Sequence, residues 1–547
     1  MRTRVLRSLR PGSFAPGPRV GDRFQPHPAA ADAPERRPTP RRNLRDALWG
    51  LAGSGLGLLV GVPASATPES VADEARALAK ADRPEEAEQR LEARLARAPT
   101  DTDAWIALGE ARRQRCRQAL AEGAFRRAID LDPLDPVARG GLAEVRMLSG
   151  EPYAALVEAQ AGVDAGERSG RPDARPWRAK AWALVELRRY DLAVAAAERA
   201  TALAPWDPRC AETLVSAQFR SGRMDLASAS YRRAVFLDAR TEEANLRLGN
   251  GFGPETPDRP WRDGADAPAF REALAAWGRG DLAAAEDDFH ALANRRPDDY
   301  KYRLGIGLTR LSIRRSHEAW LGGDPTAIYR RLPAPEIPDL EKMVPGYERL
   351  GEVERHVVRV ATAPAKPLWP ALVAAGAHHE AVPLADDLTD SDERKELRHR
   401  RTFDGRWYGH LRGVGGAQGA TGAEKLREAA EFGFNTFAHE FGHQVHRHGL
   451  TPTQQTEVDA LYAKAVSGNL CLDYYAASNA DEYFAQGYEA FVSPLKRGCL
   501  NETSRHTRPE LLRKDPALHA FLASVLDVSY ESPEALASML HAAMAPP

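Results

Sequence analysis

A chain of 547 residues is long enough to form several domains. Its 75 Lys and Arg residues nearly balance its 77 Asp and Glu residues, and the net charge of −2 gives no reason to expect a nucleic-acid partner. With 43% hydrophobic and 28% charged residues, the composition is that of an ordinary soluble, globular protein.

The first 66 residues have the character of an export leader. Residues 1–46 contain 11 Arg, no Lys and four acids, a composition that cannot bury a core. The apolar run Ala47–Val62 and the sequence Ala64-Ser65-Ala66 then complete the order of a signal peptide, and the run is shorter than the about 20 residues of a membrane span. Residues 40–45 (PRRNLR) also resemble a twin-arginine export signal. We therefore expect a disordered Arg-rich leader and signal peptide over residues 1–66. The protein is expected to be exported (periplasmic or secreted), with no stable membrane span. The alternative is that the segment is retained as an N-terminal anchor.

Residues 67–320 contain an internal repeat. The offsets of the tetratricopeptide (TPR) pattern occur at Trp105, Leu108, Gly109, Ala121, Phe125, Ala128 and Pro133. They recur at Trp177, Ala181, Ala193, Ala200 and Pro205, at Leu214, Ala227, Tyr231 and Ala234, and more weakly at Ala75, Ala87 and Pro99 and at Ala273, Ala285, Phe289 and Pro297.

This spacing predicts an all-α solenoid of TPR-like hairpins. Small residues let two helices approach at their crossing, a large residue fills the adjacent gap, and each hairpin buries its open face only against its neighbours. Residues 251–268, rich in Gly and Pro, interrupt the pattern and are expected to form a loop. Such a solenoid offers a concave face for a protein or peptide partner; the alternative is a spacer or scaffold packed on the next domain.

The candidate catalytic and metal-binding residues lie after residue 400. His439-Glu440-Phe441-Gly442-His443 is an HExxH motif, in which residues four apart share one face of a helix. Both imidazoles can then bind one Zn²⁺, and Glu440 can accept a proton from water. Phe437, Phe441 and Val445 supply the apolar stripe that such a helix needs.

A candidate for the third zinc ligand is Glu482, 39 residues after His443, in a second helix that is predicted to begin at Asn479. Glu482 would complete a His, His, Glu site with one position left for water. Asn479 and Glu482 also have the spacing of a capping box, so Glu482 could instead close the helix end. Glu489 is a rival ligand on the same face.

Taken together, HEFGH, Tyr475 and the sequence Glu482-Tyr483-Phe484-Ala485 resemble the catalytic domain of the anthrax lethal factor family, within the gluzincin class of metallopeptidases. The resemblance covers roughly residues 400–492 and includes the Gly-rich stretch Arg412–Gly416. It implies zinc ligands at His439, His443 and Glu482, Glu440 as the general base, and Tyr475 as a hydrogen-bond donor to the developing oxyanion. Tyr474 is adjacent and remains an alternative for that role.

One position departs from the family pattern, because Gln486 stands where the family has a carboxylate. Weaker zinc binding is a plausible consequence, since a charged acceptor near a ligating imidazole raises its basicity. The nearby His446 and His448, and His378 with His379, are interpreted as solvated. The run Val357–Ala361 is predicted to be a strand, and either it or Arg406–Leu411 is expected to be the edge strand that pairs with substrate in zincin folds.

Of the four cysteines, Cys471 and Cys499 flank the Glu482 helix and are expected to form a disulfide after export. Cys116 and Cys210 lie about three repeats apart and are expected to remain free thiols.

The sequence therefore predicts a multidomain protein, with an all-α TPR solenoid over residues 67–320 and an α+β zincin-like metallopeptidase domain over residues 325–547. The predicted function is zinc-dependent hydrolysis of peptide bonds, with the repeats recruiting a substrate or partner protein. The alternative is a non-enzymatic TPR binding or scaffold protein with a degenerate zincin domain.

Overall fold

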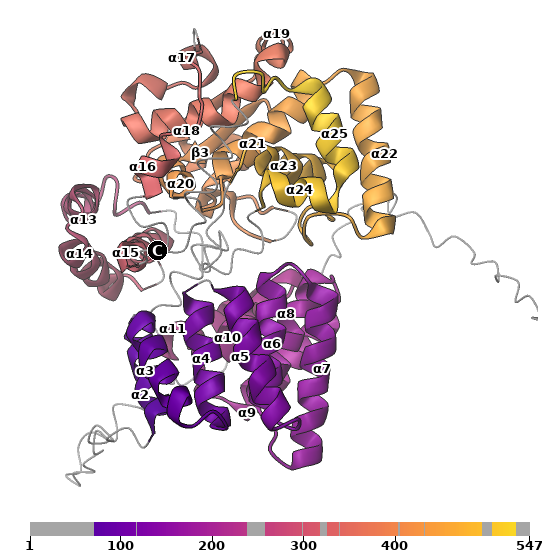
Figure 1. Cartoon of the computed structure of the whole chain (residues 1–547). Coiled ribbons are helices and arrows are strands. Elements are labelled where there is room, and N and C mark those ends of the chain that lie inside the picture. The colour runs from indigo at the N-terminus through magenta and orange to yellow at the C-terminus, as the bar shows by residue number, and fades with distance from the viewer. Residues whose placement is uncertain are drawn as a thin grey trace, which may run out of the picture. The chain divides into compact units, whose positions relative to one another are not determined.

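Antiparallel helical hairpins make up the N-terminal half of the described chain (Figure 1). The computed structural model describes residues 70–531, apart from residues 82, 116, 238–257, 298, 318–324, 338–339, 403–404, 432 and 495–505. The leader expected over residues 1–66 thus lies outside the described residues. The helices of this half are α2 (Val71–Lys80), α3 (Pro84–Arg97), α4 (Thr102–Gln114), α5 (Gln118–Leu131), α6 (Pro136–Leu148), α7 (Pro152–Ser169), α8 (Ala174–Glu186), α9 (Tyr190–Leu203), α10 (Pro208–Arg220) and α11 (Met224–Leu237).

The first helix of a hairpin starts repeatedly at an Asp followed by a Pro. The Asp135 carboxylate accepts a hydrogen bond from the backbone N–H of Ala138 at 2.7 Å, and Pro136 occupies the first helical position. Asp207 and Pro208 do the same at the start of α10. An Asp cap satisfies a free N–H group, and Pro at this position loses no hydrogen bond, so the sequence itself sets where these helices begin.

Phe125 shows how the repeat spacing becomes packing. Its side chain is fully buried, and a Cβ atom added at Gly109 or Gly141 would meet its ring at 2.8 or 2.4 Å. Only glycine therefore leaves room for the ring between α4 and α6. The small and large positions predicted from the repeat pattern do occupy the helix crossings.

Three further helices follow: α13 (Ala267–Arg279), α14 (Leu282–Arg295) and α15 (Tyr300–His317). Phe289 fits against Gly305 as Phe125 does against its glycines, with an added Cβ only 2.4 Å from the ring. Lys301 of α15 is fully buried and donates to the backbone oxygen of Leu384 at 2.9 Å, while its ammonium pairs with Asp387, also at 2.9 Å. A buried ion pair thus joins α15 to the segment that follows β1 (His378–Val382).

The remaining residues combine helices with one small mixed sheet. The helices are α16 (Pro325–Tyr329), α17 (Leu340–Met343), α18 (Glu352–Thr362), α19 (Trp369–Ala374), α20 (Ala423–Ala430), α21 (Thr436–Gln444), α22 (Pro452–Gly468), α23 (Ala480–Phe491), α24 (Arg508–Lys514) and α25 (Pro516–Val525). Short 3-10 turns are η1 (Tyr347–Arg349), η2 (Ala363–Leu368), η3 (Leu388–Asp390), η4 (Lys395–Leu397) and η5 (Tyr408–His410), and η6 (Val445–Gly449) is a π-helical turn.

The sheet has the order β1-β3-β2. Strand β3 (Gln418–Gly422) pairs in parallel with β1, with His378 opposite Gln418, and antiparallel with β2 (Gly413–Val414), with Gly413 opposite Thr421. Within the described residues β2 therefore forms one edge of the sheet.

The two strands predicted from the sequence are wrong. Val357–Ala361 lies within helix α18, because its apolar residues follow the helical period and bury one face of that helix. Arg406–Leu411 contains the turn η5 and a single bridge between Arg401 and Trp407. In the described residues the two outer strands of the sheet are β1 and β2, and β2 follows this stretch directly.

His379 is also misjudged, because it is fully buried in β1 and not solvated. Its Nε2 atom lies 2.8 Å from Thr421 Oγ1, and its Nδ1 atom lies 3.3 Å from Gln444 Oε1. Burial lowers the pKa of His379 to about 3. The neutral ring thus ties β1 to β3 and α21.

This burial predicts a pH dependence of stability. An unfolded histidine takes up a proton near pH 6.5, whereas folded His379 does so only near pH 3, so between these values unfolding binds one more proton. The free energy of unfolding should fall by up to about 1.4 kcal/mol per pH unit below pH 6.5. Urea unfolding at pH 7 and pH 5 measures this free energy, and its decrease between the two pH values should be smaller in His379→Gln than in the wild type. An equal decrease in both proteins would contradict the prediction.

The cysteine predictions fall largely outside the described part of the chain, because Cys116 and Cys499 do. Cys210 is a buried free thiol, whose pKa burial raises to about 11. Cys471 is buried as well, and the pairing of Cys471 with Cys499 stays a prediction.

Candidate metal centre

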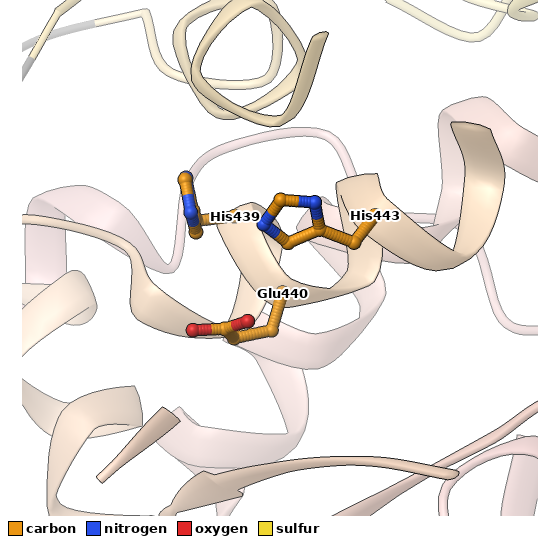
Figure 2. A group of neighbouring side chains, drawn as sticks. All are labelled: His439, Glu440 and His443. Atoms are coloured by element: carbon orange, nitrogen blue, oxygen red, sulfur yellow. The ribbon is translucent and has the colours of Figure 1, made fainter. Parts of the chain in front are cut away.

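Helix α21 carries His439, Glu440 and His443 on adjoining positions of its surface (Figure 2). Its N-cap is Asn435, whose side chain accepts a hydrogen bond from the backbone N–H of Ala438 at 3.0 Å. One ligand atom from each of the three motif residues lies within 4.8 Å of the others. The sequence motif is therefore a cluster in space.

The opposite face of α21 is the apolar stripe predicted from the sequence. Phe437, Phe441 and Val445 are fully buried. Gly442 lets α23 cross α21 closely, because an added Cβ would lie 3.1 Å from the Cα atom of Ala485. This close crossing brings the start of α23 to the two imidazoles.

Glu482 meets both histidines at this crossing. Its Oε2 atom lies 3.1 Å from Nε2 of His439 and 3.4 Å from Nε2 of His443. Burial alone would raise the pKa of Glu482, but the two imidazoles outweigh it and hold that pKa well below its ordinary value. Three potential ligand atoms from two helices thus converge.

Their spacing fits a tetrahedral zinc ion. Zinc–nitrogen and zinc–oxygen bonds of about 2.0–2.1 Å place neighbouring ligands about 3.3 Å apart. The observed separations bracket this value. Glu482 Oε2 is also buried without a hydrogen bond of acceptable geometry among the described residues, a costly state for a carboxylate that a cation would relieve.

The sequence left two alternatives open: that the Glu482 side chain closes its helix end, and that Glu489 is the ligand. The Asn479 side chain caps α23 by accepting from the Glu482 backbone N–H at 2.9 Å, while the Glu482 carboxylate faces the histidines. Glu489 is fully buried, and its Oε1 atom accepts from the backbone N–H of Asn435 at 3.2 Å. Glu489 therefore holds the start of α21.

Burial raises the pKa of Glu440, although the imidazoles of His439 and His443 oppose that rise. A carboxylate of raised basicity is suited to accept a proton. The glycines of the β2 segment make room for it: a Cβ atom added at Gly413 would lie 2.6 Å from Glu440 Oε1, and one added at Gly415 would lie 2.9 Å from Cδ2 of His443. The Gly-rich stretch singled out in the sequence thus lies directly against the motif.

Of the two adjacent tyrosines, Tyr475 lies beside the cluster. Its ring centroid is 6.1 Å from that of His439. Tyr474 is 6.3 Å from Tyr475, centroid to centroid, and burial raises the pKa of Tyr474 above its ordinary value.

A second contact between the helices was missed in the sequence. His446, interpreted there as solvated, is buried, and its Nδ1 atom lies 2.9 Å from Asp481 Oδ1. Arg447 pairs with the same carboxylate. Asp481 precedes Glu482, so this contact fixes the first turn of α23 against η6, the turn that follows α21. No spacing rule would have linked these residues before the two helices were known to cross.

The comparisons with known proteins concern the helical array. A tetratricopeptide repeat family model matches residues 72–136 and 178–249. The N-terminal array is built from tetratricopeptide repeats. None of the curated proteins compared with the chain matches it.

Solved structures similar to the chain include PilW, a type IV pilus biogenesis factor, with 16% identity, a TM-score of 0.29, and coverage of 43% of this chain and 94% of that one. The Pseudomonas aeruginosa pilF structure has 14% identity, a TM-score of 0.27 and coverage of 43% and 93%. YrrB, described as a TPR protein with an unusual peptide-binding site, has 14% identity, a TM-score of 0.23 and coverage of 40% and 97%. Among the described residues, no helix is both long and apolar enough to cross a membrane.

Proposed function

We propose that the protein is a zinc-dependent peptidase of the gluzincin type, with a zincin-like α+β domain over residues 325–547 and TPR repeats that bind its substrate or a partner protein. The convergence of His439 Nε2, His443 Nε2 and Glu482 Oε2 carries this proposal. The resemblance of the HEFGH, Tyr475 and Glu482 sequences to the lethal factor family supports it.

The residues of the proposed site divide three tasks among them. His439, His443 and Glu482 would hold Zn²⁺, which lowers the pKa of water and polarises a carbonyl group. Glu440 accepts the proton of the attacking water and passes it to the leaving amine. Tyr475 donates a hydrogen bond to the oxygen on which negative charge develops.

Strand β2 is suited to hold an extended substrate. It is an edge of the sheet within the described residues, and its Gly413 lies directly against Glu440. A peptide that adds to such an edge is held by main-chain hydrogen bonds, which suit many sequences. The scissile bond would then run past the general base.

Hydrolysis of a peptide library by the full-length protein tests the proposal. The zinc-loaded protein should cleave, a chelator should abolish cleavage, and added Zn²⁺ should restore it. Cleavage that survives complete removal of the metal would exclude the assigned chemistry.

A second candidate function is a binding or scaffold protein without hydrolysis. It is favoured by the family match, which lies wholly in the TPR repeats, a module used for protein–protein interaction. A zinc-loaded protein that cleaves nothing across the library but binds a peptide through the repeats would support this function instead. For either function we propose that residues 1–66 direct export.

A further inference from the structure

The loop that carries Tyr475 is held by a buried cluster of three polar side chains, Asp473, Gln486 and His506, called here the Asp473 cluster. Asp473 Oδ1 accepts hydrogen bonds from the backbone N–H groups of Tyr475 at 2.9 Å and Ala476 at 2.8 Å. Asp473 Oδ2 accepts from Gln486 Nε2 at 3.2 Å and lies 3.1 Å from His506 Nε2. The three side chains are only 8%, 1% and 9% exposed.

Gln486 connects this cluster to the metal centre. It follows Glu482 by one helical turn on α23, so the two side chains leave the same helix on the same side. Through Asp473, the helix that presents the Glu482 carboxylate is therefore bonded to the loop that presents Tyr475. Because a misplacement of about 1 Å costs about 10²-fold in rate, such a bond matters for an oxyanion donor.

The identity of residue 486 follows from its partner. Asp473 is acceptor-only when ionised, so the residue facing Oδ2 has to donate, and the Gln486 amide does. A glutamate at this position would place two buried acceptors about 3 Å apart, where like charges repel strongly.

We propose that Gln486 and Asp473 are positioning residues that hold Tyr475 beside His439, so that the departure from the family pattern is a change of hydrogen-bond partner. This inference rests on the proposed peptidase function. According to this inference, Gln486 affects the placement of Tyr475 and does not affect zinc affinity.

Gln486→Glu provides the test. The new carboxylate repels Asp473 and releases the loop, so kcat should fall, by no more than the 10²–10³-fold expected for loss of one oxyanion donor. KM and zinc content should stay unchanged. Gln486→Met, which removes the donor without adding a charge, should lower kcat in the same direction and replaces Gln486→Glu if the latter does not fold.

A reciprocal substitution should rescue the activity. In the double variant Gln486→Glu with Asp473→Asn, the donor and acceptor exchange sides, and the side-chain oxygen at position 473 can still accept from Tyr475 and Ala476. The new amide has a second N–H group for His506 Nε2, which accepts it in the neutral tautomer protonated at Nδ1. Its kcat should return towards that of the wild type. In a Tyr475→Phe background, Gln486→Glu should lower kcat no further, because the hydroxyl that it displaces is already gone.

Amide hydrogen exchange gives a readout independent of catalysis. The backbone amides of Tyr475 and Ala476 should exchange faster in Gln486→Glu than in the wild type, and slowly again in the double variant. Unchanged exchange and unchanged kcat in Gln486→Glu would overturn the inference. If no variant cleaves any peptide while exchange still follows the substitutions, the proposed function fails and the contact between Gln486 and the Tyr475 loop stands.

Discussion

A Glu440→Gln variant is expected to keep its zinc and its fold while hydrolysis falls by about 10²–10⁴-fold, the usual contribution of a general base. The glutamine has nearly the same shape but cannot accept the proton of the attacking water. Burial raises the pKa of Glu440, and a raised pKa suits the proposed role of this carboxylate as the proton acceptor. The measurement is kcat/KM on a peptide cleaved by the wild type, together with the metal content of both proteins.

The matched control is Glu489→Gln, because Glu489 is also buried near α21 but bonds the backbone of Asn435. Its cleavage rate should stay within about tenfold of the wild type, since the side-chain oxygen of the variant can still accept the hydrogen bond from Asn435. A Glu440→Gln protein that cleaves at the wild-type rate would show that the mechanism is wrong, whatever the metal content.

Tyr475→Phe is expected to lose about 10²–10³-fold in kcat with little change in KM, because removal of one oxyanion donor weakens the transition state and leaves substrate binding intact. The aromatic ring, which lies 6.1 Å from that of His439, is retained in the variant. Single-turnover kinetics at saturating peptide measure the effect.

Tyr474→Phe serves as the control for this experiment. Tyr474 is the neighbouring tyrosine, and the same hydroxyl is deleted there without touching the side chain beside His439. Its kcat should match that of the wild type. A larger loss in Tyr474→Phe than in Tyr475→Phe would transfer the oxyanion role to Tyr474.

The helical array was predictable because its pattern is local. Each TPR hairpin repeats the same spacing, and the residues that meet at a helix crossing, such as Phe125 and its glycine partners, lie close together in the sequence. The HExxH residues were predictable for the same reason, since a spacing of four residues on a helix places both imidazoles on one face. Glu482 was predictable only in part, because its carboxylate could equally have closed its own helix.

Contacts between elements that lie far apart in the sequence were not predictable. Val357–Ala361 has β-branched residues suited to a strand, but packing of one face makes it helix α18. His379 and His446 are buried only because β3 and α23 happen to supply Thr421 and Asp481. The hydrogen bond from Gln486 to Asp473 was not predictable either, because Asp473 lies in a loop outside the helix of Gln486.

Zinc stoichiometry of the purified full-length protein tests the central claim most directly. Elemental analysis after removal of metal and reloading should give one zinc per chain for the wild type and for Glu489→Gln, and a loss of most of that zinc in Glu482→Ala. The reason is that Glu482 Oε2, 3.1 and 3.4 Å from the two histidine nitrogens, is the proposed third ligand, whereas Glu489 Oε1 accepts a hydrogen bond from the backbone of Asn435. Full zinc retention in Glu482→Ala, or no zinc in the wild type, would contradict the account.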